Sequence, residues 1–557
     1  MIEMEENNRK RSAFIPLLIA LALATGILLG IRLGKTAADA GANHRLMFFS
    51  HYGKINQALE FIKNSYVDGI SANILEEEAI RGMLKNLDPH SYYISASDFS
   101  TVNDPLEGNF SGIGVKFNMI NDTIIIVNIY AEGPSEKAGI MAGDRIVRVD
   151  DLVVAGVKMP SDKIVKMLKG PTGTTVKVGI HRKGAGELLD FIVTRDRMPI
   201  FSIDAAYMIT PETGYIRVNK FAKTTMQEFI EAAGKLKAEG MKKMIVDLRD
   251  NPGGIIESAI RMSELFLPAG KLIVYTDGSQ RGRTNYYSNG KNKEYSDMGL
   301  VLLIDESSAS ASEIMAGAIQ DNDRGTIIGR RSYGKGLVQE QYPLTDGSAI
   351  RITIARYYTP TGRCIQKPYN PNDKSEYFNE LNIRYSHGEM TQADSIRFND
   401  SLRYETPAGK VVYGGGGIMP DIFMPFDTSG YSRYLSLVTR RDRNFTARFA
   451  FDYVDKNRKE LSQLQDDKAL SAYLRKKNIL DEFVKYASRH GVPKNDNDLK
   501  ISGPLIENIV MAGIVRIILD DNGFYTILNQ MDKMVLKAIE VLEVENPGGS
   551  SRSSRIE

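Results

Sequence analysis

The chain has 557 residues, of which 42% are hydrophobic and 25% charged, and its formal net charge is +2. This mix is typical of globular protein, and at roughly 150 residues per domain the length predicts several domains. The near balance of charge gives no sign of a nucleic acid partner. The single cysteine, Cys364, excludes an intramolecular disulfide framework and a zinc site built from several cysteines.

An apolar segment near the N-terminus predicts a membrane anchor. Arg9, Lys10 and Arg11 precede an uncharged run over residues 13–31, which at about 1.5 Å per residue spans roughly 28 Å, the thickness of a bilayer core. The basic cluster predicts that residues 1–12 stay cytoplasmic and that the rest is exported, to the periplasm in a Gram-negative cell. Two alternatives are a signal peptide cleaved near Ala38-Asp39-Ala40 and a buried core helix.

The next segments are predicted to be helical and then β-rich. Apolar residues recur at helical spacing over 45–87 and stop at Asp88-Pro89, so we assign residues 32–103 to a helical region. Short runs such as TIIIVNIY and TVKVGI follow, separated by glycine and proline turns. They predict a small β-rich module over residues 104–197.

Strands and helices alternate from Gly214 to about Pro425, which predicts an α/β core with largely parallel strands over residues 198–428. Predicted strands include GYIRVNKF, KKMIVDLR, LIVYT and LVLLID; predicted helices are 225–237, 255–267 and 311–320. Residues 429–557 are predicted to form a charged helical extension, with a disordered tail from about Gly548.

A serine-rich loop and a glycine-flanked lysine are candidates for catalysis. Residues 307–313, SSASASE, follow a predicted strand and open a predicted helix, where a serine can attack a carbonyl beside free backbone N–H groups. The alternative is a plain helix N-cap. Lys335 lies between Gly334 and Gly336, and burial there would make it a base. The alternative is a solvated loop lysine.

The remaining motifs bear on how such a site would be completed. None of the six histidines lies in the serine loop or in the strands beside it, since His181 falls in the β module and His387 in a polar insertion. Lys335 is therefore the better candidate base. The turn after Asp247, NPGG, can present a backbone N–H to an oxyanion or be merely a tight turn. The loop SGIGV at 111–115 can capture a terminal carboxylate or be a structural turn. No metal or cofactor motif is present.

Taken together, these motifs resemble the carboxyl-terminal processing proteases, also called tail-specific proteases. Over residues 50–427 the chain carries, in the family's order, LDPHS, SGIGV, GPSEKAGIMAGD, DLRDNPGG, SASASEI, YGKGLVQ, DGSAIRITIARYYTPTGR and GIMPD. The resemblance implies a serine endopeptidase that binds the C-termini of protein substrates and cleaves them by acyl transfer.

The resemblance also assigns roles to residues. It makes Ser310 the nucleophile and Lys335 the general base. Gln339 orients the lysine, Asp321 has a supporting role, Ala311 with Gly253 or Gly254 forms the oxyanion hole, and Gly112, Ile113, Gly114 and Val115 form the carboxylate-binding loop.

The fold implied is a crotonase-like α/β protease core with an inserted PDZ domain, a transmembrane helix and helical N- and C-terminal regions. The implied partners are proteins with free C-termini and the inner membrane; a homo-oligomer or an adaptor protein stays open. A non-catalytic PDZ scaffold and a cytoplasmic crotonase-like acyl-CoA enzyme are the alternatives. We expect no catalytic role for Cys364, and leave packing, dimerisation and partner binding open for the extension.

Overall fold

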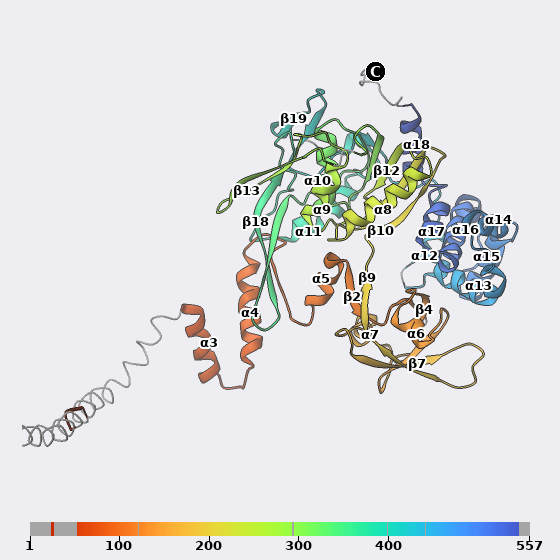
Figure 1. The fold of residues 1–557 in the computed structure, drawn as a ribbon, viewed down its shortest axis with the longest axis horizontal. Coiled ribbons are helices and arrows are strands. Elements are labelled where there is room, and N and C mark those ends of the chain that lie inside the picture. The colour runs from red at the N-terminus through yellow and green to blue at the C-terminus, as the bar shows by residue number, and fades with distance from the viewer. Residues whose placement is uncertain are drawn as a thin grey trace, which may run out of the picture. The chain divides into compact units, whose positions relative to one another are not determined.

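The protein is described by a computed structural model, which covers residues 24–26, 53–120, 122–291, 294–397, 399–440 and 442–544 (Figure 1). The chain divides into two units, residues 1–87 and 88–557, which are described separately. Three predicted features lie outside the described residues: the possible cleavage site with the alanines at 38 and 40, the predicted tail, and most of the membrane-spanning run at 13–31. Of that run only residues 24–26 are described, and they are helical.

In the first unit, two helices confirm the predicted helical pattern. They are α3 (Lys54–Ser65) and α4 (Ala72–Lys85). No side chain of α3 is buried, and on α4 only Leu84 is. The apolar residues that set the helical spacing therefore lie largely at the surface.

The second unit begins with β1 (Tyr92–Ile94) and α5 (Phe99–Glu107) and continues into the predicted β module. Its main sheet is antiparallel in the order β3-β4-β5-β7-β8, with β6 beside β5, and β2 pairs with β9. The alternating residues Ile124 and Ile126 face inward with Val176 and Val178. The elements are β2 (Asn109–Gly112), β3 (Val115–Ile120), β4 (Thr123–Ile129), α6 (Pro134–Ala138), β5 (Arg145–Val149), β6 (Leu152–Val153), α7 (Ser161–Leu168), β7 (Thr175–His181), β8 (Leu189–Thr194) and β9 (Asp196–Pro199).

The predicted α/β core is built on a six-stranded sheet in the order β10-β11-β12-β15-β16-β21. Only β10 runs antiparallel to its neighbour, so the prediction of largely parallel strands is confirmed. The strands are β10 (Ile203–Met208), β11 (Thr213–Val218), β12 (Lys243–Asp247), β15 (Gly299–Ile304), β16 (Thr326–Gly329) and β21 (Ile422–Phe423).

Helices cover both faces of this sheet. Met244 and Val246 of β12 pack with α8 (Thr225–Ala238), α9 (Ile256–Glu264) and α10 (Ala311–Asp321). Ile245 points to the other face, where it packs against α18 (Lys533–Val544). The end of the extension therefore has a packing role, because α18 closes the second face of the α/β-core sheet.

One predicted strand lies in a different sheet from its predicted neighbours. β13 (Leu272–Gly278), which contains LIVYT, turns directly into β14 (Gly282–Tyr287) and pairs antiparallel with β18 (Ala349–Tyr358). The short β13–β14 connection is a hairpin, whereas a parallel neighbour would need a long crossover. β1 and β17 (Leu337–Pro343) pair with β18 in this second sheet.

The remaining elements are an insertion and the predicted helical extension. The insertion holds α11 (Ser375–Ser386), two short 3₁₀ turns, β19 (Arg403–Glu405) and β20 (Val411–Tyr413). In the extension, α16 (Asp496–Ile518) is long and apolar enough to cross a membrane, but half of its apolar window is buried at the centre of the surrounding helices. It is the core helix of this bundle, with α12 (Arg433–Thr439), α13 (Phe445–Leu461), α14 (Asp467–Arg475), α15 (Ile479–Arg489) and α17 (Asp521–Leu528) around it.

Candidate active site

A cavity of about 470 Å³ in the α/β core brings most of the predicted catalytic residues together. Ser310, Lys335 and Gln339 line it, with both glycines of the NPGG turn. These residues come from segments that are up to 86 positions apart in the chain (253 to 339). The parallel strands deliver them to one edge, because the loops after β12, β15 and β16 leave the sheet on the same side.

Ser310 lies at the start of α10 in an unusual backbone conformation, with φ of 54° and ψ of −111°. A non-glycine residue rarely adopts positive φ, and such strain is concentrated at functional sites. The Ser310 N–H donates to the carboxylate of Glu313 at 2.7 Å. The sharp turn therefore presents the serine at the mouth of the helix, as the strand–loop–helix pattern predicts.

Lys335 is held by Gln339. Its Nζ donates to Gln339 Oε1 at 2.9 Å, and the Gln339 amide nitrogen donates to the backbone carbonyl of His90. Burial, helped by the positive charge of Arg351, lowers the pKa of Lys335 from 10.5 to about 8. Within the described residues no hydrogen bond joins Lys335 Nζ to Ser310 Oγ, although both side chains line the cavity.

Glu313 connects the serine loop to the lysine loop, and the sequence analysis did not single it out. Its fully buried carboxylate accepts hydrogen bonds from the N–H groups of Ser310, Gly334 and Lys335 at 2.7–2.9 Å and from the Ser332 hydroxyl at 2.5 Å. Burial raises the pKa of Glu313, and these hydrogen bonds oppose the rise. Its place inside the SASASEI motif was the only sequence signal.

Two further residues near the site were missed. The buried Tyr357 hydroxyl lies within hydrogen-bonding distance of the backbone carbonyls of Ser310 and Lys335, so it also ties the two loops together. His90 reaches the site from outside the α/β stretch, but its Nε2 bonds to the hydroxyl of Tyr377 at 2.6 Å. Burial and the charge of Lys335 lower the pKa of His90 to about 4, so the ring is neutral at pH 7.

The two glycines of the NPGG turn differ in what their N–H groups do. The Gly253 N–H donates to the side chain of Asn251 at 2.9 Å. The N–H groups of Gly254 and Ala311 have no acceptor among the described residues. A side chain at Gly254 would place its Cβ 2.0 Å from the carbonyl oxygen of Phe221, so glycine is required there.

Asp321 lies away from the cavity. It closes α10, about 16 Å along the helix from Ser310 at 1.5 Å per residue. Its carboxylate pairs with the fully buried Arg363 at 2.6 Å and accepts the N–H and hydroxyl of Thr361 at 3.1 and 2.7 Å. Any supporting role is therefore exerted through the turn that contains Arg363.

The predicted carboxylate-binding loop lines a separate apolar groove of about 230 Å³ in the β module. Its lining includes Leu168 of α7 and all four residues of the loop, Gly112, Ile113, Gly114 and Val115. The N–H groups of Ile113 and Gly114 have no acceptor in the described part of the chain. This is the arrangement that can bind the end of an extended peptide.

No cluster of three or more histidine, cysteine, aspartate or glutamate side chains within the described ranges is placed to hold a metal ion. The chemistry that the site offers is that of a hydroxyl, a buried amine and two backbone N–H groups that have no acceptor among the described residues.

Comparison with known families divides the chain into four matching segments. Residues 212–374 match peptidase family S41, and residues 111–193 match the PDZ domain. Residues 33–97 match the N-terminal domain of the activating protease CtpB. Residues 437–520, in the helical extension, match a family of unknown function.

Individual proteins agree with these matches. A carboxy-terminal-processing protease of Bartonella bacilliformis is 34% identical over 345 residues, which is 61% of this chain and 78% of the relative. The carboxy-terminal processing protease CtpA of Bacillus subtilis is 31% identical over 393 residues, which is 69% of this chain and 81% of the relative. Among solved structures, the photosystem II D1 C-terminal processing protease is 26% identical and covers 67% of this chain and 92% of its own, with a TM-score of 0.34.

Proposed function

Because the chain belongs to peptidase family S41, as a carboxy-terminal processing protease with a PDZ domain, we propose that it is a serine endopeptidase in which Ser310 is the nucleophile and Lys335 the general base. The observation that carries the proposal is the single cavity lined by Ser310, Lys335 and Gln339. We also propose that the α/β core is crotonase-like.

The first step is attack on the scissile carbonyl. Neutral Lys335 Nζ takes the proton of Ser310 Oγ as Oγ bonds to the carbonyl carbon. The lysine then gives this proton to the leaving amine, and an acyl-enzyme remains. A water molecule, deprotonated by the same lysine, then attacks the acyl carbon. The lysine returns this proton to Ser310 Oγ as the acid product leaves. With a pKa of about 8, roughly one lysine in ten is neutral at pH 7.

The hydrogen bond between base and nucleophile has to form when substrate binds. Lys335 Nζ is bonded to Gln339 at 2.9 Å, so the amide sets the direction of the amine. Catalytic hydrogen bonds often tighten only in the substrate complex. We propose that peptide binding completes the Lys335–Ser310 contact, and that a ligand in the PDZ groove favours this state.

The oxyanion would be held by the N–H groups of Ala311 and Gly254. Both lack an acceptor among the described residues, whereas the N–H of Gly253 is already bonded to Asn251. This difference favours Gly254 over Gly253, a choice that sequence alone leaves open. Loss of one oxyanion donor typically costs a factor of about 100–1000 in turnover.

The substrate would be a protein with a free and apolar C-terminus. The terminal carboxylate would bind the N–H groups of Ile113 and Gly114, and the last side chain would enter the groove beside Leu168. The groove lining includes Phe117 and Val165 and a single charged side chain, Lys169, which already pairs with Asp104 at 2.9 Å. The lining therefore favours an apolar last residue.

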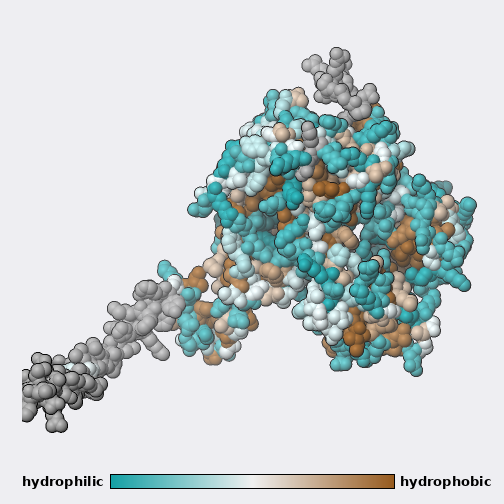
Figure 2. All heavy atoms as spheres, viewed as in Figure 1, coloured by the Kyte–Doolittle hydropathy of each residue, from teal (hydrophilic) through white to brown (hydrophobic). Residues whose placement is uncertain are grey.

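The cellular setting is also a proposal. The apolar run at 13–31 after three basic residues supports a single-pass anchor in the inner membrane with the catalytic part in the periplasm. Tyr66, Val67 and Ile74 of the first unit are 56–89% exposed, and Figure 2 shows brown apolar residues among the teal over its two helices. Such exposure supports an association there, with a second copy or an adaptor protein.

The test is digestion of an unfolded protein substrate by the wild-type enzyme and by the Ser310→Ala variant, with the products identified by mass spectrometry. We expect internal cleavage by the wild type, dependent on a free substrate C-terminus, and none by the variant. Equal cleavage by the two enzymes would overturn the assignment of Ser310, and intact substrate with both would favour a non-catalytic scaffold.

A further inference from the structure

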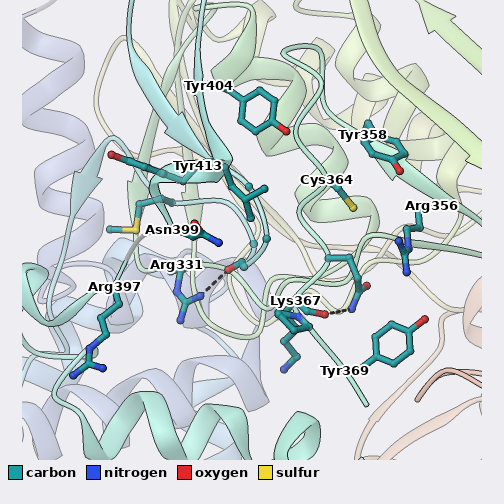
Figure 3. Close-up of a pocket in the computed structure, with 18 of the residues that line it drawn as sticks. Arg331, Arg356, Tyr358, Cys364, Lys367, Tyr369, Arg397, Asn399, Tyr404 and Tyr413 are labelled. Carbon is teal, nitrogen blue, oxygen red and sulfur yellow. Dashed lines mark hydrogen bonds between the residues drawn. The ribbon is translucent and has the colours of Figure 1, made fainter. Parts of the chain in front are cut away.

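The two loops that carry the base and the oxyanion donor are held by different parts of the chain. The loop that carries Lys335 is held within the α/β core, where Arg331 donates to the Gly416 carbonyl at 2.9 Å (Figure 3). The NPGG turn has a partner outside that core. Nη1 of Arg249, which lies just before the turn, donates at 2.7 Å to the carboxylate of Asp532 in the extension. A residue 283 positions away therefore reaches the base of the turn.

The Arg249 guanidinium joins two carboxylates. Its Nε and Nη2 donate to Asp247 at 2.9 and 2.6 Å, and its Nη1 donates to Asp532. Within the described ranges these two are its acidic partners. Asp247 is fully buried, and the side chains of Arg249 and Asp532 are 13% and 22% exposed. Hydrogen bonds between charged groups that are shielded from water in this way are the strong ones, so Asp532 supplies a substantial part of what fixes Arg249.

The peptide group that links Arg249 to Asp250 is the start of the turn, and it is held on both sides. The Arg249 carbonyl accepts a hydrogen bond from Arg217 at 3.1 Å, and the Asp250 N–H donates to Asp305 at 3.0 Å. Asp250 has a φ of 59°, a conformation that few residues other than glycine adopt. The Gly254 N–H lies four residues further on. The position of Arg249 therefore sets the path by which the chain reaches the oxyanion donor.

We propose that Asp532 of the extension is a positioning residue for the reaction: by holding Arg249, it fixes the turn that aims the Gly254 N–H at the oxyanion. The inference rests on the proposed function, in which that N–H is a donor. A donor of this kind has to lie about 2.7–3.1 Å from the oxyanion, and a misplacement of about 1 Å can lower the rate by a factor of about 100. The extension then contributes to catalysis as well as to packing.

Asp532→Asn separates this role from the folding of α18. One carboxylate oxygen, Oδ1, accepts the N–H groups of Met534 and Val535 at 2.9 and 3.2 Å and so caps the helix, while Oδ2 accepts Arg249. Asparagine caps a helix about as well as aspartate does. With its oxygen kept at the cap, it would turn its amide N–H groups, which are donors, towards the donors of Arg249. The variant thus removes the contact with Arg249 and keeps the cap.

The readout is a pair of inhibitors that differ only in whether they form an oxyanion. With a peptidyl trifluoromethyl ketone, Ser310 Oγ bonds to the ketone carbon, Lys335 takes the hydroxyl proton, and the former carbonyl oxygen becomes the oxyanion. The matching secondary alcohol cannot accept the serine, so it binds through the contacts of the peptide alone. Both inhibition constants would be measured on the full-length protein, together with kcat and KM for a fluorogenic peptide.

We expect Asp532→Asn to weaken inhibition by the ketone at least tenfold and to lower kcat at least tenfold. Inhibition by the alcohol and KM should stay within twofold of the wild type. A merely structural loss would lower the amount of active enzyme, and so kcat, without changing the affinity of the ketone. Asp466→Asn is the control, because it makes the same change at the exposed N-cap of α14, where Asp466 accepts the Ala469 N–H at 2.8 Å. It should match the wild type in all four constants.

The proposal is overturned if the ketone inhibits Asp532→Asn as strongly as the wild type, or if the affinity of the alcohol falls by the same factor as that of the ketone. Thermal unfolding establishes that the variants are folded. If Asp532→Asn does not fold, Asp532→Ser, which also keeps a cap oxygen, is measured in the same way, and failure of both to fold overturns the proposal too. A ketone that does not inhibit the wild type would instead overturn the proposed function, and this inference with it.

Discussion

Replacing Gln339 with glutamate tests how the pKa of the Lys335 amine is kept low. In the protein the amide oxygen of Gln339 accepts the Lys335 Nζ at 2.9 Å. Gln339→Glu would place a negative charge at that distance. A close opposite charge favours the charged form of a group and shifts its pKa by roughly 1–3 units.

The size of the effect follows from the pKa of Lys335, about 8. Raising it by roughly 1–3 units reduces the neutral fraction at pH 7 from about one in ten to between one in 100 and one in 10,000. At pH 7 the variant should thus be slower by about 10–1000-fold, which corresponds to roughly 1.4–4 kcal/mol. The loss should shrink as the pH rises.

The assay is the pH dependence of kcat/KM for cleavage of a fluorogenic peptide, which reports the pKa of the base in the free enzyme. The direction in which the rate changes with pH is fixed by the chemistry. A base that must be neutral gives a rate that rises with pH and levels off above its pKa, near 8 for the wild type. In Gln339→Glu this rise should move up by at least one pH unit.

Gln339→Met is the uncharged control. Like Gln339→Glu it loses the donor to the His90 carbonyl, and it also loses the acceptor for Lys335, but it adds no charge. Its plateau should fall while the midpoint of the rise does not move up. A midpoint that is the same in Gln339→Glu and in the wild type would refute the reasoning, as would a wild-type rate with no rise near pH 8. Gln463→Glu, an exposed site in the extension, should behave as the wild type.

Three other outcomes are expected. Ser310→Ala and Lys335→Ala should each lower kcat by at least about 10⁴-fold with unchanged thermal unfolding, and residual activity near wild type in either would contradict its role. Leu168→Glu places a carboxylate in the PDZ groove. It should weaken the binding of a labelled peptide with a free apolar C-terminus at least tenfold, as measured by fluorescence anisotropy. Unchanged affinity would mean that the peptide binds elsewhere. Leu542 on α18 is 1% exposed, and Leu542→Ala should lower the free energy of unfolding, measured with denaturant, by about 2–5 kcal/mol. Leu536 on the same helix is 47% exposed, and Leu536→Ala should lower it by under about 0.5 kcal/mol. Equal losses would contradict the packing of α18 on the sheet.

Much of the fold follows from local patterns in the sequence. The short runs of consecutive apolar residues in KKMIVDLR and LVLLID predict buried strands, and the structure has them as β12 and β15. Helix α10 was predicted to within one residue because its serine-rich start and its apolar run are both local signals. The pairing of β13 was not predictable in this way, because β13 belongs to the second sheet through partners about 80 residues further along.

The residues of the candidate site could be named from the sequence, but the hydrogen bonds that connect them could not. Motif order was enough to name Ser310 and Lys335. It did not reveal that the carboxylate of Glu313 bonds to both loops, since this depends on the fully buried position of that side chain. Nor could it predict that Gln339 is held by a carbonyl 249 residues away. Long-range contacts of this kind are set by tertiary packing, on which local patterns carry no information.

The extension illustrates the same limit. Its helices were predicted from composition, but their function was left open among packing, dimerisation and partner binding. The contact of α18 with Ile245 and Leu303 of the protease-core sheet assigns it a packing role. Nothing in the spacing of α18 alone distinguishes a face that covers a sheet from one that contacts another helix.

The most direct test of the central claim is to identify the residue that a serine-reactive fluorophosphonate labels. The purified protein would be labelled, digested and mapped by mass spectrometry, in parallel with Lys335→Ala. The account predicts a single labelled residue, Ser310, and labelling slowed at least 100-fold in the lysine variant. A label on another serine, or labelling of Ser310 at the same rate without Lys335, would contradict it.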